Sequence, residues 1–256
     1  MHPWFAASAS PRVLAHRGFV PPGSEGVAEN TAAAFAAAHA AGAAYVESDC
    51  HLTVDGQVVL FHDDDLSRVA GDPRPVSAVT FAELERIMSD RGGLLGLGQA
   101  LDAFPTLRFN LDVKAAAAAD AVGRGVARES SRVLLTSFSD DRRRRALAAA
   151  RASGGDPATS GGRAVITTLL AAVTSRSPRL VRRALAGVDA VQVPERYGRV
   201  RIVTRRLVDA VHGAGAEVHV WTVNDRHDML RLLDLGVDGL VSDRADLAVE
   251  AVASER

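Results

Sequence analysis

The feature of this sequence that most constrains its fold is a regular alternation of short apolar runs with alanine-rich or amphipathic runs. The apolar runs are typical of buried strands, and the intervening runs carry helix signals. Strands that alternate with helices form right-handed βαβ units and a parallel sheet. Eight such units predict an α/β fold closed as a (β/α)8 TIM barrel, for which 256 residues is an ordinary length.

The eight strands are expected at residues 13–18, 45–53, 108–114, 132–138, 164–170, 189–194, 217–224 and 239–243. The first helix is expected to begin after Asn30 or Thr31, both good N-caps, and to end near Gly42. Later helices are expected over 115–129, from 140 onward, over 178–186, 204–213 and 225–235, and at the C-terminus. This order predicts one helix after nearly every strand.

The regular alternation of strand and helix signals is interrupted after the second predicted strand. A short apolar return at 58–61 is followed by prolines at positions 73 and 75 and by a helix signal at 80–88. Thr80 is the expected N-cap of that helix, and Glu83 would complete a capping box. We therefore expect a small insertion at approximately 54–106, within a barrel domain that occupies residues 1–256.

Composition excludes several classes of protein. The net charge is −1, so there is no electrostatic basis for binding nucleic acid or an anionic membrane surface. A single cysteine, Cys50, rules out an internal disulfide framework. No stretch is long and apolar enough to span a membrane, and the first ten residues do not read as a signal peptide. These features predict a cytoplasmic protein without integral membrane contact.

Polar side chains gather where the predicted strands end. The apolar run that begins at Val13 ends in His16, Arg17 and Gly18, and the glycine allows the chain to turn sharply. Barrels keep their active sites at the carboxyl ends of their strands. A proton carrier beside a forked cation is suited to handling a phosphate. The plainer alternative is a hydrogen-bonded histidine and a surface arginine at a strand edge.

Three carboxylates, Glu47, Asp49 and Asp112, are expected to converge from two neighbouring strands. Buried together without neutralisation, they would repel one another and raise one another's pKa. A hard divalent cation removes this repulsion, and oxygen ligands suit Mg²⁺ or Ca²⁺. The alternative for each carboxylate is an ion pair with Arg17 or Lys114.

Lys114 is the only lysine among 30 cationic residues, so its position is a candidate for needing lysine specifically. Cys50 has the opposite strand parity to the acids and is expected to pack outside the barrel as a small hydrophobe. His51 could line the pocket or pack structurally. His219 shares a strand face with Trp221 and could belong to either the pocket or the core.

Taken in order, these pieces resemble the glycerophosphodiester phosphodiesterase family. The resemblance covers nearly the whole chain and rests on His16-Arg17-Gly18, Glu29-Asn30-Thr31, Glu47-x-Asp49, His62-Asp63, Asn110-x-Asp112-x-Lys114, Trp221-Thr222-Val223-Asn224 and Asp238-Gly239. It implies a TIM barrel with a segment inserted after the second strand. It also implies hydrolysis of a glycerophosphodiester to sn-glycerol 3-phosphate and an alcohol, with one divalent cation, Mg²⁺ or Ca²⁺.

The resemblance also implies roles for individual residues. His16 and His62 resemble the family's general acid/base pair, and Arg17 resembles its phosphate-binding arginine. Lys114 matches the lysine of its motif, and Trp221 resembles a pocket aromatic that packs against the substrate. The implied metal ligands are Glu47, Asp49 and Asp112. Asp112 stands where the family usually has glutamate, and the stretch before Arg108 lacks the usual Pro-Thr-Leu-Glu segment.

Two other functions are compatible with the same barrel. One is a phosphodiesterase or phospholipase that cleaves phospholipids, although aromatic residues make up only 5% of the chain and no membrane-docking stretch is evident. The other is a barrel that binds glycerophosphodiesters without hydrolysing them. Retention of both histidines and all three acids favours an enzyme. The sequence does not indicate which alcohol is released.

Overall fold

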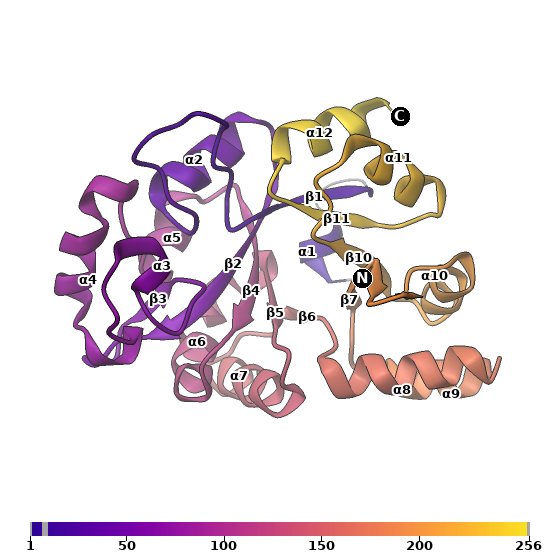
Figure 1. Ribbon diagram of the computed structural model, residues 1–256. Coiled ribbons are helices and arrows are strands. Elements are labelled where there is room, and N and C mark those ends of the chain that lie inside the picture. Colours follow the sequence, from indigo (N-terminus) through magenta and orange to yellow (C-terminus); the bar gives the residue numbers. More distant parts are fainter. Residues whose placement is uncertain (1, 7–9, 255–256) are drawn as a thin grey trace.

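The computed structural model describes residues 2–6 and 10–254 and shows a closed barrel of eight parallel strands (Figure 1). Around the barrel the strands follow the order β6-β5-β4-β2-β1-β11-β10-β7, and a parallel bridge between Ser160 and Ala190 closes the ring. The barrel strands are β1 (Arg12–His16), β2 (Tyr45–Leu52), β4 (Arg108–Val113), β5 (Val133–Thr136), β6 (Ala158–Thr159), β7 (Ala190–Pro194), β10 (Glu217–Trp221) and β11 (Gly239–Ser242). The predicted TIM barrel is thereby confirmed.

Helices cover the outside of the barrel, as Figure 1 shows for α2, α6, α7 and α10 to α12. The α-helices are α1 (Pro3–Ala6), α2 (Ala32–Ala40), α3 (Ser67–Ala70), α4 (Phe81–Met88), α5 (Leu97–Ala103), α6 (Ala119–Val126), α7 (Asp140–Ala152), α8 (Arg163–Thr174), α9 (Pro178–Ala184), α10 (Arg205–His212), α11 (Arg226–Asp234) and α12 (Ala245–Ser254). Their apolar faces and the outward faces of the strands form the main core, which includes the buried thiol of Cys50.

The predicted N-caps are present. Thr31 accepts a hydrogen bond from the backbone N–H of Ala34, and Thr80 accepts one from Glu83, each at 3.2 Å. Each bond satisfies a backbone donor that the first turn of a helix leaves unpaired. Two helix starts were therefore predictable from local sequence alone.

The predicted strand at 164–170 is wrong, because these residues lie in helix α8. A continuous apolar run such as Val165 to Leu170 fits a buried helix as well as a strand. The helix start is fixed from outside, since the Asp140 carboxylate accepts backbone N–H bonds from Gly162, Ala164 and Val165 at 2.9–3.2 Å. The true fifth strand of the barrel, β6, has two residues and lies before this run, in a segment where no strand was predicted.

Between β2 and β4 the chain forms β3 (Val58–Leu60), α3, α4 and α5 around a separate apolar cluster that includes Leu66, Leu84 and Met88. Strand β3 pairs antiparallel with β2 and runs back toward the barrel. The backbone N–H of Phe61 then donates to the carbonyl of Asp49 at 2.9 Å. This return places His62, the next residue, beside the carboxyl end of β2.

Helix α1 covers the amino-terminal end of the barrel. Trp4 is fully buried against Tyr45 and donates its indole N–H to the carbonyl of Phe109 at 3.0 Å. A further hairpin of β8 (Arg196–Tyr197) and β9 (Val200–Arg201) follows β7. With one end of the barrel plugged, ligands have access to its interior from the carboxyl end.

Candidate active site

All the site residues predicted from the sequence line one cavity of about 600 Å³ at the carboxyl end of the barrel. They are His16, Arg17, Glu47, Asp49, His62, Asp112, Lys114 and Trp221. They come from the ends of β1, β2, β4 and β10 and from the segment that follows β3. The tertiary fold therefore brings together residues that lie as much as 205 positions apart.

The turn after β1 has an unusual backbone. Arg17 has φ of 58°, in the left-handed region that side chains with a Cβ adopt rarely, and Gly18 follows with φ of 85°. The N–H of Arg17 donates to the carbonyl of Glu47 at 2.8 Å, and its own carbonyl accepts from Asn30 at 2.8 Å. A Cβ at Gly18 would lie 2.8 Å from the backbone of Ala34. The fold thus holds Arg17 in a strained conformation that directs it into the site.

The three carboxylates lie on adjacent strands. Asp49 is opposite Asp112 in the register of β2 and β4, and all three carboxylates, Glu47 included, are at least 92% buried. The ammonium of Lys114 lies 3.0 Å from Asp49 and 2.8 Å from Asp112, and the Arg17 guanidinium lies 3.5 Å from Asp49. The ion pairs considered as an alternative to a metal are therefore present. Burial lowers the pKa of Lys114, but the two carboxylates outweigh burial and raise it.

The same carboxylates have the chemistry that a hard cation requires. Burial and the neighbouring charge of Asp49 raise the pKa of Glu47 to about 8, and burial also raises the pKa of Asp112. One oxygen of Asp112, Oδ1, is buried without a hydrogen-bond partner among the described residues. A divalent cation would relieve both the repulsion and the unpaired oxygen. As now placed, however, no three His, Cys, Asp or Glu side chains within residues 2–6 and 10–254 are grouped closely enough to hold a metal ion.

His16 is oriented by a carboxylate that the sequence analysis did not assign. Its Nδ1 lies 2.6 Å from Asp243, which also accepts from the Asn224 amide at 2.7 Å. Its Nε2 lies 3.8 Å from Glu47, on the cavity side. Burial lowers the pKa of His16, but the bond to Asp243 and the charge of Glu47 outweigh burial and raise it. Asp243 directly follows β11, so its position at a strand end was a usable sequence signal.

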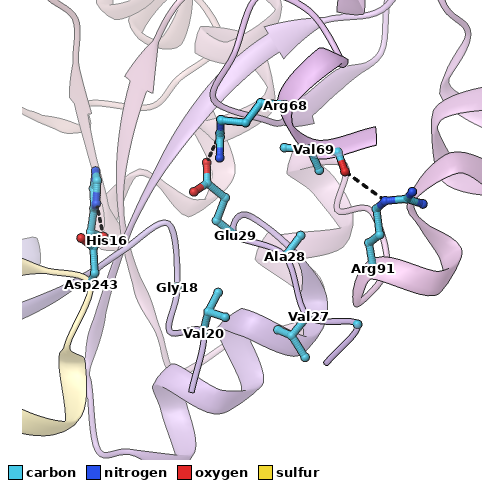
Figure 2. A pocket seen from close by; sticks show the side chains of 11 residues that line it. His16, Gly18, Val20, Val27, Ala28, Glu29, Arg68, Val69, Arg91 and Asp243 are labelled. Atoms are coloured by element: carbon cyan, nitrogen blue, oxygen red, sulfur yellow. Dashed lines mark hydrogen bonds and ion pairs between the residues drawn. The ribbon is translucent and has the colours of Figure 1, made fainter. Parts of the chain in front are cut away.

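His62 is held by a chain of ion pairs that runs to Arg17. His62 Nδ1 lies 2.7 Å from Asp63, and Asp63 accepts from Arg68 at 2.7 Å. Arg68 in turn donates to Glu29 at 2.6 Å, and Glu29 also accepts from Arg17 at 2.9 Å. Figure 2 shows the Arg68–Glu29 and His16–Asp243 pairs around a second cavity of about 520 Å³, which His16 also lines. No local pattern in the sequence links Arg68 to this network.

His51 does not line the cavity. It is buried, and its Nε2 lies 3.2 Å from the backbone carbonyl of His62. Burial lowers the pKa of His51, which favours the neutral ring. Of the two alternatives for His51, the structure supports a packing role, with the ring bracing the segment that carries His62.

One wall of the cavity is apolar. The rings of Trp221 and Phe138 meet edge to face with centroids 5.9 Å apart, and the Lys114 ammonium lies 5.6 Å from the Phe138 ring centroid. Phe138 is 51% exposed despite its size. Ile166, Leu170, Tyr197 and Ile202 extend this wall. The site therefore combines charged groups for a phosphate with an apolar surface for an organic group.

A family model described as "Glycerophosphoryl diester phosphodiesterase family" matches residues 16–247. The chain belongs to this family. It is 36% identical over 240 residues to "Probable glycerophosphodiester phosphodiesterase 2" of Mycobacterium tuberculosis. The matched region covers 91% of this chain and 88% of that protein. The phosphodiesterase is thus a phosphoric diester hydrolase that acts on glycerophosphodiesters, as the resemblance predicted.

Two further proteins are similar to this chain over most of its length. A phosphodiesterase from Oleispira antarctica, solved in complex with the product sn-glycerol-3-phosphate, superposes with a TM-score of 0.71 at 23% identity and covers 95% of this chain and 97% of that one. A lysophospholipase D from Rattus norvegicus is 24% identical over 91% of this phosphodiesterase and 83% of its own length. Metal dependence is a general property of the family. Within the described residues, no helix of the phosphodiesterase could cross a membrane.

Proposed function

We propose that this enzyme releases sn-glycerol 3-phosphate and an alcohol from glycerophosphodiesters, with His16 and His62 as the acid/base pair. The observation that carries the proposal is the pairing of each ring with a carboxylate, Asp243 for His16 and Asp63 for His62, at one charged cavity. A carboxylate on Nδ1 orients an imidazole and leaves Nε2 for proton transfer. A cytoplasmic location, expected from the single cysteine, is part of this proposal.

The phosphodiester anion would bind against Arg17 and Lys114, which lie just beyond the ends of β1 and β4. We propose that Glu47, Asp49 and Asp112 hold one divalent cation, Mg²⁺ or Ca²⁺. When bound, the cation would neutralise phosphate charge and polarise the phosphoryl oxygens. Arg17 and Lys114 supply fixed positive charge where negative charge accumulates in the transition state.

The reaction breaks the ester bond between phosphorus and the oxygen of the leaving alcohol. The attacking oxygen, from water or from the glycerol 2-hydroxyl, forms the new bond to phosphorus while one histidine accepts its proton, and the other histidine donates a proton to the leaving oxygen, so that no free alkoxide is released. Where the 2-hydroxyl attacks, water then opens the cyclic phosphate to give sn-glycerol 3-phosphate. Asp243 and Asp63 stabilise whichever ring is protonated at each stage. The Trp221 and Phe138 rings pack against the organic part of the substrate and exclude water from that side.

The test of this proposal is the release of sn-glycerol 3-phosphate from glycerophosphocholine, glycerophosphoethanolamine and glycerophosphoglycerol by the purified enzyme. We expect hydrolysis to stop on exhaustive chelation and to recover on addition of Mg²⁺ or Ca²⁺. Hydrolysis that persists in protein shown by elemental analysis to be metal-free would refute the cation assignment. Binding of these diesters without any product would instead support a non-catalytic barrel.

A second candidate substrate is a lysophospholipid. The apolar wall from Phe138 through Leu170 to Tyr197 provides a surface that an acyl chain on the glycerol arm could follow, and Tyr197 is 79% exposed. The Rattus norvegicus relative is a lysophospholipase D. Release of choline from lysophosphatidylcholine at a rate comparable with that from glycerophosphocholine would establish this activity, and its absence would restrict the enzyme to water-soluble diesters.

A further inference from the structure

A line of buried and half-buried polar side chains crosses the barrel interior from its amino-terminal end to the floor of the catalytic cavity. Its members are Arg12, Glu217, His219, Gln192 and Asn110, contributed by β1, β10, β7 and β4. The proposed chemistry uses none of them. Buried polar groups that are linked in this way restrict one another's donor and acceptor roles.

The line begins at an ion pair beneath the cavity. Arg12, 3% exposed, donates to both carboxylate oxygens of Glu217 at 2.7 and 2.9 Å. Burial raises the pKa of Glu217, but the hydrogen bond with His219 and the ion pair with Arg12 outweigh burial and lower it to about 2. Near neutral pH this carboxylate is ionised and can only accept hydrogen bonds.

The Glu217 carboxylate therefore determines which nitrogen of His219 carries a proton. His219 is fully buried, and its Nε2 lies 3.1 Å from Glu217, so Nε2 must be the donor. The ring has room because residue 239 is glycine; a Cβ there would lie 2.6 Å from His219 Cδ2. The other nitrogen, Nδ1, faces the amide nitrogen of Gln192 at 3.2 Å and accepts from it.

The orientations of the Gln192 and Asn110 amides follow from the position of the proton on His219. With its nitrogen committed to His219, Gln192 presents its oxygen to Asn110, whose amide nitrogen donates to it at 3.3 Å. Asn110 is 1% exposed and lines the cavity, and its Oδ1 has no hydrogen-bond partner among the described residues. A buried acceptor without a partner has lost its hydrogen bonds to water without replacement, so this oxygen is expected to receive a donor when the site is filled.

We propose that the line of side chains from Glu217 to Asn110 fixes the Asn110 oxygen as an acceptor for the terminal hydroxyl of the substrate's glycerol arm. This assignment rests on the proposed function. Asn110 lies two residues before Asp112 on the same strand face, which places it about 6.6 Å farther from the cavity mouth along β4. Since Arg17 and Lys114 hold the phosphate at the mouth, the far end of the glycerol arm is the part that reaches this depth.

The direction of the hydrogen bonds along this line of side chains, which we call its polarity, can be measured without any substrate. In protein labelled with ¹⁵N-histidine, two-bond ¹H–¹⁵N spectra report which ring nitrogen of His219 carries a proton. We expect a neutral ring with its proton on Nε2. A proton on Nδ1, alone or together with Nε2, would mean that Gln192 turns its oxygen to His219 and that Asn110 presents its NH₂ to the cavity, and this result would overturn the proposal.

The substrate contact is tested by pairing one variant with one substrate analogue. The phosphocholine ester of propane-1,2-diol keeps the 2-hydroxyl of glycerophosphocholine but lacks the terminal hydroxyl. For Asn110→Leu we expect kcat/KM on glycerophosphocholine to fall tenfold or more, but kcat/KM on the analogue to change less than threefold. Thr136→Val, which alters another polar residue of the same cavity, should affect both substrates equally.

Three outcomes separate the possible failures. Equal losses on both substrates with Asn110→Leu would show that Asn110 does not contact the terminal hydroxyl, and the proposal would be wrong. Loss of Mg²⁺ or Ca²⁺ binding by calorimetry in Asn110→Leu would assign the oxygen to the cation instead, and would also overturn it. Absence of hydrolysis in the parent enzyme would refute the proposed function, whereas the His219 spectrum would still decide the polarity of the line.

Discussion

At the scale of single residues, the site depends on side chains held between partners of opposite charge. Lys114 lies between Asp49 and Asp112, and Arg68 lies between Asp63 and Glu29. Such positions constrain size and shape as well as charge, because the partners are themselves fixed by the barrel. Substitutions that keep the charge but change its shape therefore test the site most sharply.

Lys114 is expected to be needed as a lysine. Its ammonium bridges two buried carboxylates and faces the Phe138 ring, and an arginine fork is too broad for the same contacts. We expect Lys114→Arg to lower kcat/KM about tenfold or more, which corresponds to about 1.4 kcal/mol of transition-state stabilisation. Steady-state kinetics with saturating divalent cation measure the effect. A value within twofold of the parent would mean that charge alone suffices at this position.

Arg68 is expected to position His62 and Arg17 without touching the substrate. Removing it leaves Asp63 and Glu29 without a shared cation, so His62 and Arg17 each lose an anchor. We expect Arg68→Ala to lower kcat about tenfold with little change in KM, and Arg68→Lys to restore part of the loss. Arg74→Ala is the matched control, because Arg74 pairs with Asp72 and Glu83 on the same segment. Similar losses in both variants would contradict a specific role for Arg68.

At the scale of secondary structure, seven of the eight barrel strands were predictable, because each is an apolar run that ends in polar residues. The fifth along the chain was not, since β6 has only two residues and the apolar run after it forms α8, whose first turn is capped by Asp140, 24 positions before Ala164. Helix α5, in a stretch taken as part of the irregular insertion, was also missed. A two-residue strand that is held by its neighbours in the barrel has no recognisable pattern in the local sequence. The same is true of a helix whose N-terminal cap comes from a residue far away in the chain.

In the site, too, some features are visible in the local sequence and others depend on the tertiary fold. His16, Arg17 and the three acids were predictable because they are polar residues within or at the ends of apolar strands, and all of them line the cavity. The partners that hold the two histidines were harder to assign. Asp63 adjoins His62 in sequence, but Arg68 reaches it only through the fold of α3. Roles that depend on tertiary ion pairs cannot be derived from spacing along the chain.

The ion pair between Arg12 of β1 and Glu217 of β10 is expected to stabilise the fold in a pH-dependent way. The pKa of Glu217 falls from an ordinary 4.5 to about 2 on folding, so its contribution is complete above about pH 4.5 and is lost as the pH falls toward 2. We expect Glu217→Gln to lower the free energy of unfolding by about 3 kcal/mol at pH 7, because the buried ion pair between Arg12 and Glu217 is lost.

Urea unfolding of the parent and Glu217→Gln at pH 7 and pH 3 measures this contribution. The difference between the two proteins should shrink at pH 3, since the parent has by then lost part of the stabilisation that the variant never had. A difference that stays constant between the two pH values would show that Glu217 does not titrate as described.

At the scale of the whole molecule, stabilising interactions and candidate catalytic groups lie at opposite ends of the barrel. Helix α1 and the Arg12–Glu217 pair close the amino-terminal end, whereas the cavity at the carboxyl end collects the charged groups and His16 and His62. His16 is the last residue of β1, whereas His62 follows the return strand β3 in the segment inserted after β2. Only the closed barrel brings both to one cavity.

The most direct test of the central claim is the rate at which His16→Ala and His62→Ala release sn-glycerol 3-phosphate from glycerophosphocholine, with circular dichroism to verify that each variant is folded. If both rings transfer protons in the reaction, each substitution should lower kcat by roughly 10²–10⁴-fold. Turnover close to that of the parent in either folded variant would remove that histidine from the mechanism and contradict the assignment of this cavity as a two-histidine active site.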